Sequence, residues 1–153
     1  MDTNEMSRRG ALVAGGLGAL AIAGLAGSAR AASPIHSPAD RANIKLVSDF
    51  CHSWNDPDQA VTMLAPDAAV RMYFDKPPIV GAAEVRAEMQ KFMGLKDKVT
   101  VNIHKIFAEG PVVVVVRTDT LTSPGKPDQV FKIVGVFNVR NGKIQEWIDY
   151  NDG

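Results

Sequence analysis

Three charged side chains in the C-terminal third of the chain have types and spacing that suit acid–base chemistry: Arg117, Asp119 and Asp149. Side chains alternate between the two faces of a strand, so Arg117 and Asp119 share one face of a strand-like segment. Val115 lies on that same face, which places a charged pair in line with valines. In the last strand-like segment, Asp149 follows Trp147 on one face.

These charges allow two interpretations. A surface ion pair is the common one, and it contributes only about 0–1 kcal/mol to stability. The other is a buried carboxylate–arginine–carboxylate bridge, which is costly unless every charge is paired. In such a bridge the neighbouring carboxylates push their pKa values apart, so one can hold a proton while the other stays ionised. A buried bridge would therefore supply one general acid and one general base.

The elements that must position these residues begin with helices. Apolar residues at spacings of three and four predict helices over residues 40–54, 58–64 and 81–93. Between the second and third helices we expect a turn at Ala65-Pro66-Asp67 and a short strand over 68–74, followed by a proline loop.

Four longer strands are expected after the third helix. Five consecutive valines are a strong β-branched signal, and Asn141-Gly142 predicts a tight hairpin because both central turn residues tolerate positive φ. The strands are expected over residues 98–107, 111–122, 129–140 and 143–150. Helices followed by a meander of strands predict an α+β fold with the helices on one face of the sheet. A strongly curved sheet would leave a pocket between the two layers.

The N-terminal segment has a different character. Residues 1–31 combine Ser7-Arg8-Arg9 with a weakly apolar run rich in Ala and Gly, and end at Ala29-Arg30-Ala31. This is typical of a twin-arginine export signal with a small-residue cleavage site, so the mature protein is expected in the periplasm or secreted. An uncleaved N-terminal anchor is the alternative. Residues 32–40 are expected to form a linker and residues 41–153 the folded domain.

Composition excludes several classes of function. The net charge is zero, whereas a nucleic-acid partner would require a basic stripe. The single cysteine, Cys51, cannot form an intramolecular disulfide and lies on an apolar helix face, so we expect a small buried hydrophobe. The histidines are scattered, which argues against a metal site. We expect no cofactor and, once the signal is cleaved, no stable membrane association.

Four short motifs resemble limonene-1,2-epoxide hydrolases, a family within the nuclear-transport-factor-2-like superfamily that also includes SnoaL and ketosteroid isomerase. The resemblance covers about Asn43 to Asp152, and the strand with Arg-x-Asp followed by Trp-x-Asp-Tyr is its most specific part. The motifs are Arg117-Thr118-Asp119, Val134-Gly135-Val136-Phe137, Gly142-Lys143-Ile144 and Trp147-Ile148-Asp149-Tyr150.

This resemblance implies a fold and an activity. The fold is a cone-shaped, curved, mixed or antiparallel sheet packed against three N-terminal helices, also called cystatin-like or NTF2-like. The activity is cofactor-free, one-step hydrolysis of a small apolar epoxide. Asp149 would take a proton from water, Asp119 would protonate the epoxide oxygen, and Arg117 would bridge them. The family also implies a homodimer formed through the sheet.

One stretch departs from the family pattern. The family holds its water with a Tyr and an Asn two residues apart before a proline-rich loop, and no Tyr-x-Asn occurs here. Tyr73 is expected to supply one water ligand in a changed register, while the second is missing or comes from elsewhere. Met72, Phe137 and Trp147 are expected to complete the substrate- and water-binding surface.

Two other functions remain open from the sequence. An isomerase or cyclase acting on a polyketide or steroid-like substrate would use Asp149 or Asp119 to abstract a carbon-bound proton. A non-catalytic module would use the same cone to hold a small apolar ligand. The Arg117 side chain between two carboxylates favours epoxide hydrolysis, and burial of all three charges is the observation that separates the enzymes from a surface ion pair.

Overall fold

The structure is a computed structural model that describes residues 36–73, 75–92 and 97–151, all within the unit Pro34–Gly153. The expected export signal, residues 1–31, lies outside the described residues. Among the residues that are described, no helix is both long and apolar enough to cross a membrane.

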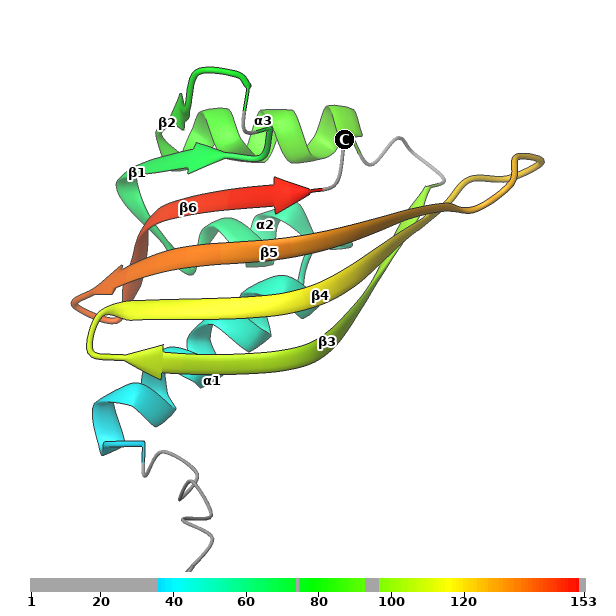
Figure 1. Ribbon diagram of the computed structural model, residues 1–153. Helices are drawn as coiled ribbons and strands as arrows, with labels where there is room; N and C mark the ends of the chain where they lie inside the picture. The colour runs from blue at the N-terminus through cyan, green and yellow to red at the C-terminus, as the bar shows by residue number, and fades with distance from the viewer. Residues whose placement is uncertain (1–35, 74, 93–96, 152–153) are drawn as a thin grey trace, which may run out of the picture. The chain divides into compact units, whose positions relative to one another are not determined.

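A six-stranded mixed sheet forms the scaffold of this unit, and Figure 1 shows its long strands twisting across α1 and α2. The strand order is β2-β1-β6-β5-β4-β3, with β1 parallel to β6 and every other neighbouring pair antiparallel. The helices are α1 (Pro38–His52), α2 (Pro57–Val61) and α3 (Ala82–Phe92). The strands are β1 (Leu64–Arg71), β2 (Ile79–Val80), β3 (Lys98–Glu109), β4 (Val112–Thr122), β5 (Gln129–Arg140) and β6 (Lys143–Asn151). The predicted α+β class and mixed sheet are confirmed.

Helix α1 begins earlier than the apolar pattern predicted. The Ser37 hydroxyl accepts a hydrogen bond from the backbone N–H of Asp40 at 3.0 Å, and the Asp40 carboxylate accepts from the Ser37 N–H at 2.8 Å. This reciprocal capping box satisfies two N–H groups at the helix start, and Pro38 is well suited to the first helical position. The last residues of the expected linker therefore belong to the helix.

The predicted turn at Ala65-Pro66-Asp67 is wrong, because these residues lie within β1. The register between β1 and β6 shifts between Leu64 and Ala69, which leaves Pro66 and Asp67 exposed at an irregular point of the ladder. A proline is tolerated at such a point because it need not donate a ladder hydrogen bond.

Ile144 departs from the alternation expected along β6. Strict alternation puts Ile144 opposite Trp147, but both side chains are buried. Asn138 pairs with Glu146 while Val139 pairs with Ile144, so β6 carries one extra residue at Gln145. Such a bulge reverses the alternation on one side of it. Beyond the bulge the pattern is regular, and Trp147 points to the core side.

Aromatic packing between α1 and the sheet fixes the orientation of Trp147. Its ring stacks on Phe137 with centroids 5.8 Å apart and planes 7° apart, and Phe50 from α1 meets it edge-on at 5.2 Å. Phe50 and Phe137 are fully buried. The ring that presents its indole N–H to the candidate site is therefore held on both sides by the core.

Candidate active site

The three charged residues singled out from the sequence lie together inside the protein. Arg117, Asp119 and Asp149 are 1%, 4% and 4% exposed. The first two come from β4 and the third from β6, with β5 between the two strands. The interpretation as a surface ion pair is wrong, and the buried bridge is confirmed.

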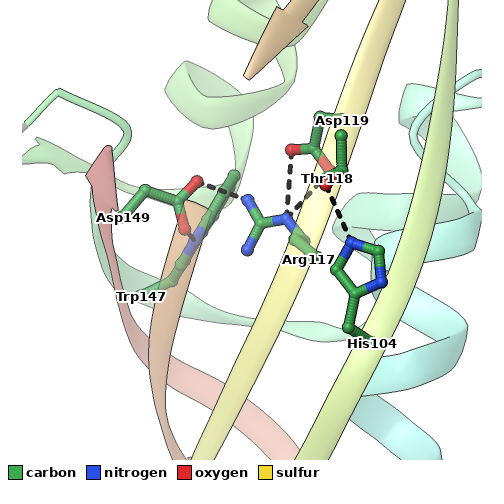
Figure 2. A network of polar contacts seen from close by, with 6 residues as sticks. All are labelled: His104, Arg117, Thr118, Asp119, Trp147 and Asp149. Atoms are coloured by element: carbon green, nitrogen blue, oxygen red, sulfur yellow. Dashed lines mark hydrogen bonds and ion pairs between the residues drawn. The ribbon is translucent and has the colours of Figure 1, made fainter. Parts of the chain in front are cut away.

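The bridge is joined by charge-assisted hydrogen bonds (Figure 2). Arg117 Nε donates to both carboxylate oxygens of Asp119, at 3.1 and 3.0 Å. Arg117 Nη2 donates to Asp149 Oδ2 at 2.6 Å. Trp147 Nε1 donates to the other oxygen of Asp149, Oδ1, at 2.6 Å. Every carboxylate oxygen therefore accepts at least one hydrogen bond, as buried ions require.

Gly135 on β5 leaves space for the side chain of Arg117. Its register partners are Val115 on β4 and Asp149 on β6, so it lies directly beneath the bridge. A Cβ atom at this position would overlap Arg117 Nη1 and approach Asp149 Oδ1 to 3.0 Å. The guanidinium thus crosses β5 over the one residue without a side chain. Sequence reasoning assigned Gly135 only to the fold, although a lone glycine inside a strand often marks such a close approach.

Electrostatics keep the arginine charged in spite of its burial. Burial disfavours the charged guanidinium, but the carboxylate of Asp149, aided by Asp119, raises the pKa of Arg117 above its usual range. The guanidinium carbon also lies 5.0 Å from the centre of the Trp54 ring, a favourable cation–π distance. Arg117 is therefore a permanent cation at any physiological pH.

The two carboxyl groups are pushed toward protonation. Desolvation by burial raises the pKa of both Asp119 and Asp149, although the nearby Arg117 opposes the rise. One cation and two carboxylates would leave a net negative charge inside the protein, and a single shared proton removes it. The pair therefore titrates as a unit that favours holding one proton.

Hydrogen-bond donors decide where that proton resides. Asp149 accepts from two donors, Arg117 Nη2 and Trp147 Nε1. Asp119 accepts only from Arg117 Nε, whose N–H is divided between its two oxygens. Because hydrogen bonds to a carboxylate favour its charged form, the ionised state is better stabilised on Asp149 and the proton on Asp119.

A cavity of about 80 Å³ opens onto the bridge. Its polar lining is made by Asp119, Asp149, Tyr73 and Asn151. Its apolar lining is made by Trp54, Met72, Met89, Phe131, Ile133 and Trp147. The structure therefore brings Tyr73, Met72 and Trp147 to the bridge, as expected from the sequence.

Phe137 does not line this cavity. It was expected to contact substrate, but it is fully buried behind Trp147, on which it stacks. Met89 was expected to be core or pocket lining, and it does line the cavity, whereas sequence reasoning missed Phe131, Ile133 and Asn151. Phe131 and Ile133 could have been found, because they precede Gly135 at steps of two and so share its face.

Other chemically capable side chains lie outside the bridge. Cys51 is buried, and burial raises the pKa of its thiol to about 12, which leaves it protonated and unreactive. His104 is exposed, and its Nε2 lies 2.8 Å from the hydroxyl of Thr118, as Figure 2 shows. Within the described parts of the chain, no group of three or more His, Cys, Asp or Glu side chains is placed to hold a metal ion.

Known proteins share this arrangement of strands and helices. An LEH-like epoxide hydrolase from M. tuberculosis is 29% identical, with a TM-score of 0.68 over 75% of this chain and 86% of that one. A putative polyketide cyclase from Xanthomonas campestris pv. campestris is 21% identical, with a TM-score of 0.64 over 74% and 92%. A putative SnoaL-like polyketide cyclase from Jannaschia sp. CCS1 is 18% identical, with a TM-score of 0.64 over 78% and 92%.

The last two likenesses concern the fold alone, and no curated protein matches the sequence. Residues 47–147, which make up more than half of the chain, match the family described as SnoaL-like domain. The chain therefore belongs to the SnoaL-like domain family and has the nuclear-transport-factor-2-like fold.

Proposed function

We propose that this protein hydrolyses a small apolar epoxide to a diol in one step, without a cofactor. The observation that carries the proposal is the buried bridge of Asp119, Arg117 and Asp149 facing an otherwise apolar cavity. The 29% identity to an M. tuberculosis LEH-like epoxide hydrolase supports the same conclusion.

The reaction balances with the groups of the bridge. Ionised Asp149 accepts a proton from water as the water oxygen bonds to one epoxide carbon. The bond between that carbon and the epoxide oxygen breaks, and protonated Asp119 transfers its proton to the departing oxygen. The products are a diol, a protonated Asp149 and an ionised Asp119. Returning one proton from Asp149 to Asp119 restores the site, so each turnover consumes one water and no net proton.

Arg117 allows one carboxyl group to act as the acid and the other as the base. It contacts both carboxyl groups, so the charge that leaves Asp149 and the charge that appears on Asp119 are stabilised by the same cation. A fixed charge inside a water-poor site need not reorganise during the reaction. Protonating the leaving oxygen matters because an alkoxide is a poor leaving group, and a positioned acid or base contributes about 10²–10⁴-fold to the rate.

The cavity limits the substrate. Its volume of about 80 Å³ is well below the roughly 300–1,000 Å³ of pockets that enclose drug-sized ligands. Aromatic, aliphatic and thioether side chains make most of its wall. These properties favour an epoxide with few carbon atoms and an apolar substituent.

The test uses the full chain incubated with small alkyl and cycloalkyl epoxides in ¹⁸O-labelled water. We expect a diol that carries one labelled oxygen. Asp149→Asn removes the base and Asp119→Asn removes the acid, so each should lower the rate by about 10²-fold or more. Asp128→Asn is the matched control, because Asp128 is an exposed aspartate on the loop before β5.

Several outcomes would contradict the proposal. Wild-type protein that converts none of these epoxides, or aspartate variants that retain full activity, would exclude it. If the wild type instead exchanges a hydrogen next to a ketone carbonyl with solvent deuterium, and Asp149→Asn does not, the isomerase or cyclase interpretation replaces it. Tight binding of the epoxide without turnover would favour a ligand-binding module.

A further inference from the structure

We infer that Asn151 binds the attacking water beside Asp149, together with Tyr73. The inference rests on the proposed function, because it concerns the water of that reaction. Asn151 stands outside the Asp119–Arg117–Asp149 bridge, near the end of the chain, and it reaches the cavity from the last position of β6.

The attacking water needs several hydrogen-bond partners to be held in place. A water fixed in a protein site makes about three hydrogen bonds, with a range of two to four. Asp149 can supply one acceptor, because each of its oxygens keeps a free lone pair after bonding Arg117 or Trp147. The remaining partners must come from other polar groups that line the cavity.

The lining leaves few such groups. Trp147 Nε1 is occupied by Asp149, and Trp54 Nε1 is a buried atom with no accessible surface for a water to contact. Asp119 is needed by the epoxide oxygen in the proposed reaction. Among the described residues that line the cavity, only the hydroxyl of Tyr73 and the amide of Asn151 remain. Each of them can both donate and accept a hydrogen bond.

Sheet geometry places Asn151 at a suitable separation from Asp149. The two residues are two positions apart on β6, so they share a face and their Cα atoms lie about 6.6–6.8 Å apart. A water that bonds both side chains at about 2.8 Å spans up to about 5.6 Å between them. Side chains leaning toward one another therefore bracket one water without any movement of the strand.

The register across the sheet puts this water next to the rest of the bridge. Asn151 pairs with Ile133 on β5, and Ile133 pairs with Arg117 on β4, so these three residues form one row across three strands. Asp149 lies two rows away, in the next row on the same face of the sheet, opposite Gly135. A water between Asp149 and Asn151 is therefore between the row of the base and the row of the arginine.

Tyr73 lines the same cavity from the segment that follows β1. Strand β1 runs parallel to β6, with Arg71 paired to Ile148. Strand β1 ends at Arg71, and Tyr73, two residues later, lines the same cavity as Asp149 and Asn151. Tyr73 and Asn151 therefore both line the cavity that Asp149 lines.

Two measurements on the full chain test the inference. The first is a high-resolution crystal structure of the wild type and of Asn151→Ala, searched for an ordered water. We expect a water within hydrogen-bond distance of Asp149, Asn151 and Tyr73 in the wild type, and its loss in the variant. The second is steady-state kinetics on the best epoxide, comparing Asn151→Ala, Tyr73→Phe and Asn102→Ala, an exposed asparagine on β3 that serves as control.

We expect Asn151→Ala to lower kcat by about 10- to 100-fold, the effect of one lost hydrogen bond to the reacting group. KM should change little, because the amide contacts water and not the apolar substrate. Asn151→Gln should recover part of the lost activity, and Asn102→Ala should match the wild type. A purely structural role for Asn151 would instead reduce stability with no selective loss of kcat.

The outcomes separate this inference from the proposed function. If the wild type makes labelled diol but Asn151→Ala turns over at the wild-type rate, the role of Asn151 is refuted while epoxide hydrolysis stands. If no epoxide is converted but the ordered water contacts Asp149 and Asn151 and disappears in the variant, the water site stands and the reaction is wrong. A wild-type structure in which no water contacts Asn151 refutes the inference in either case.

Discussion

Gly135→Ala tests whether the buried bridge depends on an absent side chain. The substitution adds one methyl group beneath the guanidinium, where its carbon would overlap Arg117 Nη1 and lie 2.9 Å from a ring carbon of Phe137. Gly135 is not among the residues with positive φ, so alanine fits its backbone without strain. Any destabilisation must then come from the contact of the methyl group with its neighbours.

The magnitude follows from two opposing effects. Replacing glycine by alanine at a compatible position stabilises a protein by about 0.4–1 kcal/mol through the unfolded chain. A displaced Arg117 loses at least one carboxylate partner, and breaking a buried ion pair costs about 3–5 kcal/mol. We therefore expect the free energy of unfolding to fall by about 2–4 kcal/mol. Movement of Phe137 alone cannot relieve the overlap, because the nearest atom belongs to Arg117.

Urea denaturation measures this loss, and a double-mutant cycle with Arg117→Ala identifies its cause. In the Arg117→Ala background the overlap with the guanidinium is gone and only the contacts with Phe137 and Asp149 remain, so Gly135→Ala should be close to neutral. The coupling energy between the two positions should therefore be about 2–4 kcal/mol. Epoxide turnover should fall with Gly135→Ala, since the acid and the base lose their common cation.

Two results would refute this reasoning. A Gly135→Ala protein as stable as the wild type, with unchanged turnover, would mean that the guanidinium does not occupy the space above β5. A loss of stability that is equally large in the Arg117→Ala background would assign the effect to Phe137 packing and not to the bridge.

Three further predictions concern the groups around the bridge. Trp147→Phe removes the 2.6 Å hydrogen bond to Asp149, so urea denaturation should show a loss of about 1.5–3 kcal/mol, and the acid limb of the pH–rate profile should move to higher pH as the pKa of Asp149 rises. Cys51, with its thiol pKa raised to about 12, should resist iodoacetamide in the native protein but react fully in denaturant, as mass spectrometry can determine. Burial raises the folded-state pKa of Asp119 above 3.8, so the folded state binds its proton more tightly. The wild type should therefore gain stability relative to Asp119→Asn as pH falls through that raised pKa, with the gain complete below pH 3.8, and a stability difference that is constant from about pH 4 to 7 would contradict this.

Much of the bridge could be predicted from the sequence, because both the alternation of side chains and the ends of the strands can be recognised there. Alternation alone places Arg117 and Asp119 on the face of Val115, and the observed burial pattern of β4 confirms it. The boundaries of β5 agree with the prediction because Asn141-Gly142 marks the hairpin that follows it. Asn141 has φ 52° and Gly142 φ 70°, the positive values that this turn requires.

Elsewhere in the sheet, irregular pairing between strands makes side-chain alternation a poor guide to which residues are buried. The extra residue at Gln145 reverses the expected face of Ile144, and no local composition announces it. The pairing of β1 with β6 likewise carries the predicted Ala65-Pro66-Asp67 turn into a strand. Both errors come from tertiary pairing, which periodicity along one segment cannot report. The face of Asp149 was predicted correctly only because Asp149 lies on the regular side of the bulge.

Gly135 and Asn151 show a second limit of prediction from sequence. This limit concerns the type of residue and not the register of a strand. Neither residue carries a charge, and neither belongs to a pattern that predicts chemistry, so both draw their importance from what lies opposite them. Gly135 matters because Arg117 crosses it, and Asn151 because it follows Asp149 by two residues at the open end of β6. Gly135 thus leaves room for the charged bridge, and Asn151 is the residue that we infer to hold a water beside it. Substituting them changes the site without touching any charge, and this makes them the sharpest test of the geometry.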